Sequence, residues 1–371
     1  MENIDSNFFS QKEKILFIKL ESIDLKKIEN NIQKNYISKN AFIIFSFIIM
    51  NLMIYLIIQL RIKIGNKNEG NNHVFQLIEE DIKSNYSFKA IYEVNSYNEN
   101  VELINRKYKD NIVEMKINRE SVFPCTNFVF MNAGNYTIYY LLNINKLEKL
   151  DEMFKGIKQL TSISFPKEFD TTNIKSLRSM FYDCKKLTSV DITNFATKNI
   201  VDIAYLFYGC SSLPSVDLHN FNSKSIKVMV SLFEGCSSLT SIDLSVFDTR
   251  YVTHINHLFK GCSSLTSVDL SNFNTESVIY MEHIFNGCSS LTSLDLSNFK
   301  TPKVKYMDCL FNRCYKLQYL DISNFTTISR DSYSGFCSLI NATGTMKIRR
   351  DLYDKVSQYI PKKWEIIFVE D

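Results

Sequence analysis

Apolar and polar residues recur along the second half of the chain with a fixed period of 26 residues. The period is clearest in a phenylalanine column at Phe195, Phe221, Phe247, Phe273, Phe299 and Phe325. An aspartate column keeps the same interval at Asp191, Asp217, Asp243, Asp269, Asp295 and Asp321. A cysteine column does so at Cys184, Cys210, Cys236, Cys262, Cys288 and Cys314. Such a period is typical of stacked repeats, because one unit cannot bury its apolar face alone.

Two different apolar patterns follow each other within one repeat. In residues 265–270, apolar and polar side chains alternate, which predicts a strand with one buried face. In residues 278–285, apolar side chains recur at steps of three and one, which predicts a short helical turn. Thr275 is placed to cap this turn and Gly287 to end it. We therefore predict an α/β solenoid, an array of 26-residue coils that each contain a short parallel strand and a helical turn.

The repeat consensus, L-x-x-V-D-L-S-N-F-x-T-x-x-V-x-x-M-x-x-x-F-x-G-C, resembles the BspA-like leucine-rich repeats of bacterial and protist surface proteins. The resemblance extends over residues 154–337, about half of the chain. It departs from ordinary leucine-rich repeats by having phenylalanine where they often have asparagine, leucine or cysteine in the turn. The resemblance implies a leucine-rich-repeat array and adhesion to host cells, neighbouring cells or matrix. The first and last copies match the consensus less closely, as capping coils are expected to do.

A continuous apolar run precedes the repeats. Residues 41–60, AFIIFSFIIMNLMIYLIIQL, contain no charged side chain and would span about 30 Å as a helix, the thickness of a bilayer core. We predict a single-pass transmembrane helix here, because a buried soluble helix is usually shorter and amphipathic. A cleaved signal peptide would have a shorter apolar core nearer the N-terminus. The lysine and arginine residues that flank the run, four before and three after, do not fix its orientation.

Glycosylation sequons favour one orientation of the chain. Four of them follow the apolar run and none precedes it; they begin at Asn85, Asn135, Asn324 and Asn341. This distribution favours a cell-surface protein whose C-terminal part lies outside. Residues 1–40 are then an N-terminal tail in the cytoplasm.

The remaining segments surround the array. Residues 61–83 are polar and contain GNKNEGNN, which predicts a juxtamembrane linker. Residues 84–150 alternate between apolar and polar and are rich in aromatic side chains, which predicts a small β-rich domain. The leucine-rich-repeat array follows at residues 151–337. Residues 338–371 predict one helix and a final strand that together cap its end.

Charge and motifs argue against several classes of protein. The net charge of +3 is small for 371 residues and gives no reason to expect a nucleic-acid partner. The sequence has no G-x-S-x-G, no phosphate-binding glycine loop, no H-E-x-x-H and no paired C-x-x-C motifs. We therefore expect neither an enzyme nor a cofactor. Nine cysteines in a chain of this length are too sparse for a small disulfide scaffold.

The cysteine and aspartate columns are the main candidate sites. We interpret the cysteines as a ladder of thiols in the core, because equivalent side chains in stacked coils point the same way and a disulfide needs converging Cβ atoms. Some bridging or a metal site are the alternatives. Carboxylates stacked about 5 Å apart repel one another unless they are screened, hydrogen-bonded or met by cations. The aspartates are therefore either a solvated column or a face that binds a basic partner or loosely held Ca²⁺.

Two smaller groups of residues share repeat positions. His257, His283 and Cys309 occupy one column, with His254 three residues before His257, and could ligate a metal or simply reflect surface variation. A second column, at Val228, His254, Tyr280 and Tyr306, is largely aromatic and could form a contact patch or be ordinary surface.

The sequence thus predicts a membrane-anchored leucine-rich-repeat surface protein that binds a protein ligand non-covalently, held to the membrane by residues 41–60. The alternative is a membrane-tethered scaffold whose repeats face the cytosol and organise intracellular partners. That alternative predicts sequons without glycans and reduced cysteines throughout.

Overall fold

The computed structural model describes residues 87–144, 147–221, 224–326 and 343–369. The chain divides into two compact units, Met1–Glu79 and Glu80–Asp371, and every described residue belongs to the second. The N-terminal tail, the linker and the transmembrane helix predicted at residues 41–60 lie outside the described residues. In the described part, no helix is both long enough and apolar enough to cross a membrane.

In the described residues before the repeats there are six strands, within the range expected to be β-rich. They are β1 (Phe88–Val94), β2 (Glu99–Glu102), β3 (Ile112–Ile117), β4 (Glu120–Val122), β5 (Asn127–Phe130) and β6 (Gly134–Leu142). All of their mutual pairings are antiparallel: β1 with β6, β3 with both β4 and β6, and β2 with β5. Alternate residues of β1, from Phe88 to Val94, are buried, so its sequence pattern gives one core face and one outer face.

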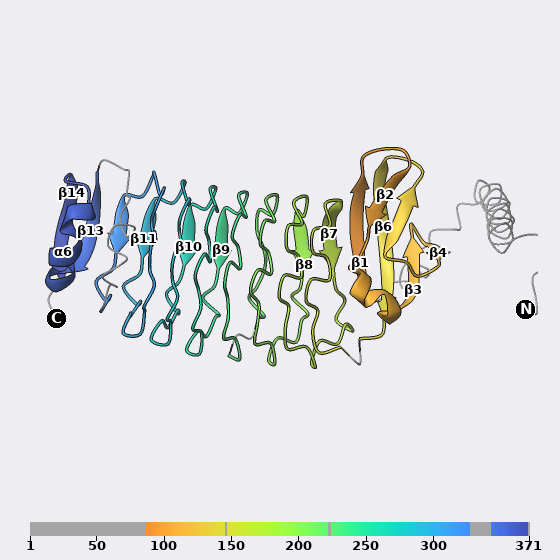
Figure 1. The fold of residues 1–371 in the computed structure, drawn as a ribbon, viewed down its shortest axis with the longest axis horizontal. Coiled ribbons are helices and arrows are strands. Elements are labelled where there is room, and N and C mark those ends of the chain that lie inside the picture. Colours follow the sequence, from red (N-terminus) through yellow and green to blue (C-terminus); the bar gives the residue numbers. More distant parts are fainter. Residues whose placement is uncertain (1–86, 145–146, 222–223, 327–342, 370–371) are drawn as a thin grey trace, which may run out of the picture. The chain divides into compact units, whose positions relative to one another are not determined.

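One sheet joins this β-rich segment to the first repeats. Its strand order is β4-β3-β6-β1-β7-β8, in which β7 (Leu160–Ser164) pairs antiparallel with β1 and parallel with β8 (Ser189–Asp191). Figure 1 shows β7 beside β1, with the later repeats following in a row. The sheet therefore crosses the boundary expected near residue 150, and a single hydrophobic core extends from the β-rich segment into the repeats.

The later repeats contribute two smaller parallel sheets. One consists of β9 (Ser241–Asp243) and β10 (Ser267–Asp269). The other has the order β11-β12-β13-β14 and consists of β11 (Ser293–Asp295), β12 (Tyr319–Asp321), β13 (Gly344–Arg349) and β14 (Trp364–Val369). The helix α6 (Arg350–Val356) and the 3₁₀ helix η4 (Ser357–Tyr359) connect β13 to β14. We call the side of the repeats that carries β8 to β12 the strand side.

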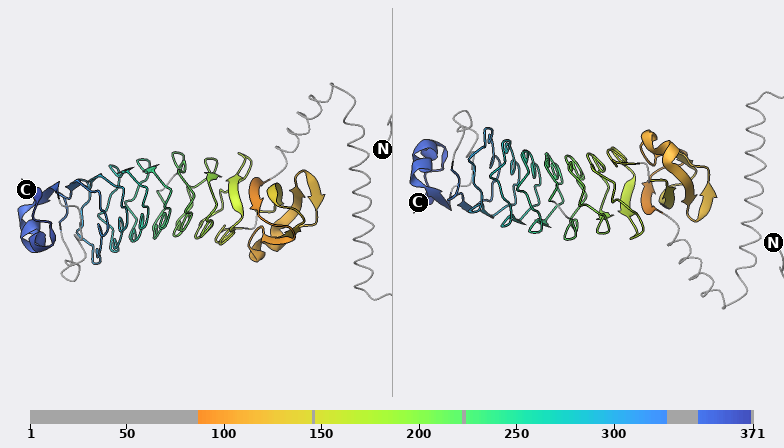
Figure 2. Two further views of the ribbon diagram at one scale, coloured as in Figure 1. Left: turned by 90° about the horizontal axis from the view of Figure 1, so that it is seen from above. Right: turned by 90° about the horizontal axis from the view of Figure 1, so that it is seen from below.

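A second line of contacts joins the repeats at parallel bridges. These run through Lys149, Ser176, Asp202, Val228, His254, Tyr280 and Tyr306. After each bridge, alternate N–H groups donate to carbonyls of the next repeat: His283 N to Asp308 O at 2.8 Å, and Phe285 N to Leu310 O at 3.0 Å. We call this line of residues, equivalent to 254–261 in each repeat, the turn side. Figure 2 shows the repeats from above and below, with loops along both edges of the row.

The prediction of an α/β solenoid with a helical turn in each coil is wrong. Residues 278–285 contain an isolated bridge at Tyr280 and a turn from Glu282 onwards, and the helices of the described part, η2 (Arg106–Asn111), α6 and η4, all lie outside the repeats. The reason is the backbone of His283, whose φ of 58° is left-handed and cannot continue a right-handed helix. Its N–H bonds to the next repeat instead of to the preceding turn. The strands moreover fall into several small sheets rather than into one array of strand-and-helix coils.

Pro214 explains one of the breaks between these sheets. In other repeats the residue at this position donates its N–H to the preceding repeat, as Thr188 does to Thr161 O at 2.8 Å and Thr266 to Thr240 O at 3.0 Å. Proline has no N–H and cannot make this bond. Residues 215–217 accordingly form no strand, and the ladder stops between β8 and β9.

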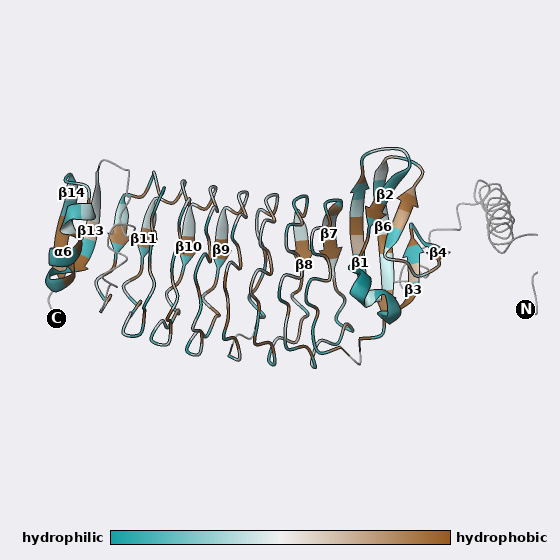
Figure 3. Ribbon diagram, in the orientation of Figure 1, coloured by the Kyte–Doolittle hydropathy of each residue, from teal (hydrophilic) through white to brown (hydrophobic). Residues whose placement is uncertain are grey.

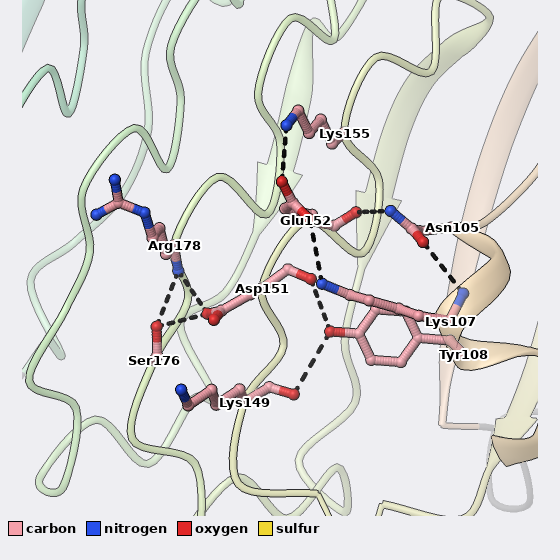
Figure 4. A network of polar contacts seen from close by, with 9 residues as sticks. All are labelled: Asn105, Lys107, Tyr108, Lys149, Asp151, Glu152, Lys155, Ser176 and Arg178. Atoms are coloured by element: carbon pink, nitrogen blue, oxygen red, sulfur yellow. Dashed lines mark hydrogen bonds and ion pairs between the residues drawn. The ribbon is translucent and has the colours of Figure 1, made fainter.

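The first repeat has no earlier repeat to donate to its turn-side carbonyls, and η2 and its N-cap residue, Asn105, supply donors instead. The Tyr108 hydroxyl donates to Asp151 O at 2.8 Å and to Lys149 O at 3.4 Å. The N–H of Asn105 donates to Met153 O at 2.9 Å. Figure 4 shows these side chains reaching across to the first repeat. The β-rich segment therefore closes the N-terminal end of the stack, as a capping element must.

Candidate functional site

The aspartate column lies on the strand side, at the end of the short strand in each repeat. Its Oδ1 atoms accept hydrogen bonds from the backbone N–H two residues further on. These distances are 2.8 Å for Ser245 N to Asp243, and 2.9 Å for both Ser271 N to Asp269 and Ser297 N to Asp295. This is the aspartate turn that reverses a chain at the end of a strand. The turn gives the column a structural reason to recur, and it occupies only one of the two carboxylate oxygens.

Exposure divides the column into a centre and two ends. Asp217, Asp243, Asp269 and Asp295 are exposed, whereas Asp191 is half-buried. Asp321 is buried, and its Oδ2 lies 3.7 Å from Lys347 Nζ. The four central carboxylates are therefore the ones that solvent or a partner can reach.

The charges at the centre of the column are not neutralised within the described part of the chain. No lysine or arginine there lies within ion-pair distance of Asp243, Asp269 or Asp295. The hydroxyl and the N–H of Ser245 hold the pKa of Asp243 below its usual value. The N–H and then the ring of His219 do the same for the pKa of Asp217. The carboxyl groups of Asp217 and Asp243 are therefore anionic at neutral pH.

Hydroxyl groups surround these carboxylates. Ser241, Ser267 and Ser293 are exposed two residues before their aspartates. The Thr266 hydroxyl donates to Thr240 O at 3.1 Å, so this threonine column ties one repeat to the one before it. The strand side thus presents carboxylates and serine hydroxyls at the spacing of parallel strands, about 4.8 Å.

The cysteine column lies in the core. All six side chains are buried as free thiols that donate to a phenylalanine carbonyl 29 or 30 residues earlier, for example Cys262 Sγ to Phe233 O at 3.0 Å. Burial raises the pKa of Cys236 to about 12, and the same cause raises that of Cys314 to about 12. These thiols are protonated and inaccessible, so the structure gives them a packing role and no reactive site.

The sequons differ in their surroundings. Asn135 is exposed on β6, opposite Glu93 of β1. The amide of Asn324 donates to Ser297 O, and the equivalent Asn298 donates to Phe273 O at 2.8 Å. A glycan on Asn324 would therefore compete with a bond between repeats, whereas one on Asn135 would not. Asn85 and Asn341 lie outside the described residues.

The histidine and cysteine column lies on the turn side of the repeats. The rings of His257 and His283 are 4.8 Å apart, and the Asn286 amide lies 2.9 Å from His283 Nδ1. Burial, and then the charge of His257, lower the pKa of His283. The described residues contain no group of three or more side chains that could hold a metal ion. These residues share a repeat position because each is the left-handed residue of its turn. Cys309, for example, has a φ of 54°.

The aromatic column on the turn side is a stack of rings. His254 and Tyr280 have ring centroids 4.4 Å apart, and Tyr280 and Tyr306 have centroids 5.0 Å apart with planes inclined by 8°. Tyr306, the last of the three, is exposed. Val228 begins the column at the equivalent bridge. Each ring therefore covers part of its neighbour's face along the stack, and of these three side chains only Tyr306 is largely exposed.

Glu234 is a turn-side residue that the sequence did not single out. Burial opposes its ionisation, but nearby donors outweigh burial and lower the pKa of this carboxyl to about 2. The Ser231 hydroxyl donates at 2.7 Å and Lys260 Nζ lies 2.9 Å away. His257 Nδ1 lies 3.5 Å from the Glu234 carboxylate but makes no hydrogen bond to it. No periodic signal could have marked Glu234, because its equivalents are Tyr208, Lys260 and Asn286.

Replacing Glu234 with glutamine is expected to lower the free energy of unfolding at pH 7 by about 1–2 kcal/mol, after allowance for solvent screening. The folded pKa of about 2 lies below the ordinary 4.5, so the carboxylate stabilises the fold above pH 4.5. That contribution disappears as the pH falls towards 2. Urea unfolding at pH 7 and pH 2.5 measures both states, with Glu276→Gln, an exposed partner of Lys300, as the control. An equal loss at the two pH values would contradict the role of the charge.

A family profile described as a Mycoplasma protein of unknown function, DUF285, matches residues 126–242 and again residues 227–344. The two matches together cover more than half of the chain. The chain belongs to the DUF285 family. The DUF285 matches include the whole aspartate column and the whole cysteine column, and their repetition agrees with the repeated sequence. No curated protein and no solved structure matches the chain.

Proposed function

We propose that this DUF285 chain is a cell-surface repeat protein of the BspA-like type that binds a partner protein non-covalently through its strand side. The observation that carries the proposal is the exposed carboxylate column at Asp217, Asp243, Asp269 and Asp295. In the described part of the chain, no lysine or arginine lies within ion-pair distance of Asp243, Asp269 or Asp295. By contrast, Glu148 and Asp202, like several other acidic side chains of the repeats, lie beside a lysine or arginine.

This arrangement favours a basic partner. Four aspartates at a spacing of about 4.8 Å form a charged line about 15 Å long. A line of that length is shorter than a standard protein interface, so the flanking serine and threonine columns complete the contact surface. Charge complementarity of this kind raises the rate of encounter and selects the partner, and salt weakens it.

Conversion of the four aspartates to asparagine tests the proposal. Asparagine keeps an oxygen that accepts the N–H two residues on, so the turn is retained and only the charge is lost. Attachment of beads coated with the full chain to a monolayer of cultured epithelial cells provides the readout. We expect attachment strength at 0.15 M salt to fall by about tenfold, or 1.4 kcal/mol.

A matched control removes the same number of charges elsewhere. Glu102→Gln, Asp110→Asn, Glu120→Gln and Glu168→Gln all change exposed side chains away from the column. This variant should attach as the unmodified chain does. Equal attachment by the aspartate variant, or an equal loss in both variants, would contradict a binding role for the strand side.

A further inference from the structure

An open pocket of about 540 Å³ lies where the β-rich segment meets the first repeats. Three neighbouring strands of one sheet, β6, β1 and β7, contribute to it, together with the loop that follows β1. The volume is within the range of about 300–1,000 Å³ that is usual for small-molecule sites. The residues that line the pocket are Glu93, Val94, Asn95, Gly134, Asn135 and Thr161.

The loop between β1 and β2 is fixed by hydrogen bonds. Glu99 Oε2 accepts the N–H groups of Asn95, at 2.7 Å, and of Ser96, at 3.1 Å. The other oxygen of Glu99 accepts from the Gln159 amide at 2.7 Å, which ties the loop to the first repeat. Figure 3 shows this loop as largely hydrophilic. The fold itself therefore positions Asn95 at the pocket.

The charged groups at the pocket are paired with each other. Lys186 Nζ lies 3.1 Å from Glu93 Oε2 and donates to Asn95 Oδ1 at 2.9 Å. A ligand that carried a negative or a positive charge would have to break this ion pair in order to be neutralised. The pair therefore favours a ligand without charge.

The other polar groups of the pocket are neutral. Asn135 is exposed, and its amide makes no hydrogen bond to any other residue of the described part. The Thr161 hydroxyl donates to Ile91 O at 3.1 Å, so its oxygen can still accept. The Asn95 amide nitrogen can still donate. A Cβ on Gly134 would meet nothing within 4 Å, so the backbone there is open to a ligand.

We propose that this pocket binds a neutral sugar residue, a hexose or an N-acetylhexosamine. Each hydroxyl of a sugar ring both donates and accepts, which matches two amides and a threonine oxygen on three different elements. The ring carries no charge, as the pairing of Glu93 with Lys186 requires. Because the pocket is open and mainly polar, we expect a Kd of about 1–10 mM for a single sugar. This inference does not depend on the strand side being a binding surface.

Saturation-transfer NMR with the full chain tests the proposal. The probes are the methyl glycosides of glucose, galactose, mannose and N-acetylglucosamine. The chain is produced in a bacterial host, because a glycan on Asn135 would cover the pocket. We expect at least one probe to bind, with a Kd that rises at least fivefold in Asn95→Ala and in Asn135→Ala. Asn143→Ala, at an exposed asparagine just beyond the other end of β6, is the matched control and should leave the Kd unchanged.

An unchanged thermal melt of each variant shows that folding is preserved. Absence of binding at about 50 mM of every probe would overturn the proposal. Binding that Asn95→Ala and Asn135→Ala leave unchanged would overturn it as well. The variant with all four strand-side aspartates changed to asparagine should bind the sugar as the unmodified chain does, which separates this pocket from the strand side.

The charge of the ligand is tested separately. Binding of a neutral sugar should not change between about 0.05 and 0.5 M NaCl, because no net charge is screened. The uronic acid and the 2-amino sugar that correspond to the best neutral probe should each bind at least fivefold more weakly. Tighter binding of either charged sugar would show that Lys186 or Glu93 is available to a ligand, which rules out the neutral class.

Discussion

Replacing Phe259 with alanine is expected to lower the free energy of unfolding by about 3–5 kcal/mol. The ring is completely buried between those of Phe233 and Phe285, and both centroid distances are 5.8 Å. Backbone hydrogen bonds between repeats hold the neighbours in place, as from Phe259 N to Ile284 O at 2.9 Å. The surroundings cannot collapse into the space that is left, so the full cost of a cavity is expected.

Denaturant unfolding followed by circular dichroism measures this loss. Phe123→Ala is the control, because that ring is 73% exposed and its removal should change stability by less than about 0.5 kcal/mol. A loss below about 1 kcal/mol for Phe259→Ala would show that the phenylalanine stack is not the rigid core described here.

Replacing Thr249 with valine is expected to cost about 2–3 kcal/mol. The Thr249 hydroxyl donates to Asn274 O at 2.9 Å and accepts from Asn274 N at 2.8 Å, so it bridges two successive repeats. Thr275 continues this bridge to Lys300 O at 2.6 Å. Both threonines are buried, and valine has nearly the same shape. The loss therefore comes from the two backbone groups of Asn274 that are left without a partner.

Thr249→Ser separates the hydroxyl from the methyl group. Serine keeps both hydrogen bonds and loses only a small amount of apolar surface, so it should cost about 1 kcal/mol or less. Comparison of the two unfolding free energies at pH 7 gives the contribution of the bridge. If serine destabilises the chain as much as valine does, the hydroxyl does not hold the repeats together.

The period of 26 residues could be read from the sequence, and with it the columns that stack. The helical turn could not be excluded in the same way. Apolar residues at steps of three and one fit a helix, but they also fit consecutive tight turns that bury the same side chains. The tight turns differ from a helix in having one left-handed residue in each repeat. That residue is Tyr205, Ser231, His257, His283 or Cys309, and no side-chain property is common to all five. Only the bonds to the next repeat select that backbone.

At the candidate site too, the surroundings of individual side chains could not be predicted from the sequence. The spacing of the aspartate column could be read from the sequence, but the exposure of its members could not. Asp321 is buried because β13, which lies outside the repeats, packs against it. Thr275 was read as a helix cap, although its hydroxyl reaches the next repeat. Glu234 owes its low pKa to Ser231 and Lys260, which come together only in the folded turns.

We propose that the strand-side carboxylates bind a partner, whereas the fold needs only the one carboxylate oxygen that accepts a hydrogen bond at the turn. The most direct test measures bead attachment and unfolding together for the variant in which Asp217, Asp243, Asp269 and Asp295 are all asparagine. We predict about tenfold weaker attachment with an unfolding midpoint close to that of the unmodified chain. Full attachment at an unchanged midpoint would contradict the account and place the binding surface elsewhere.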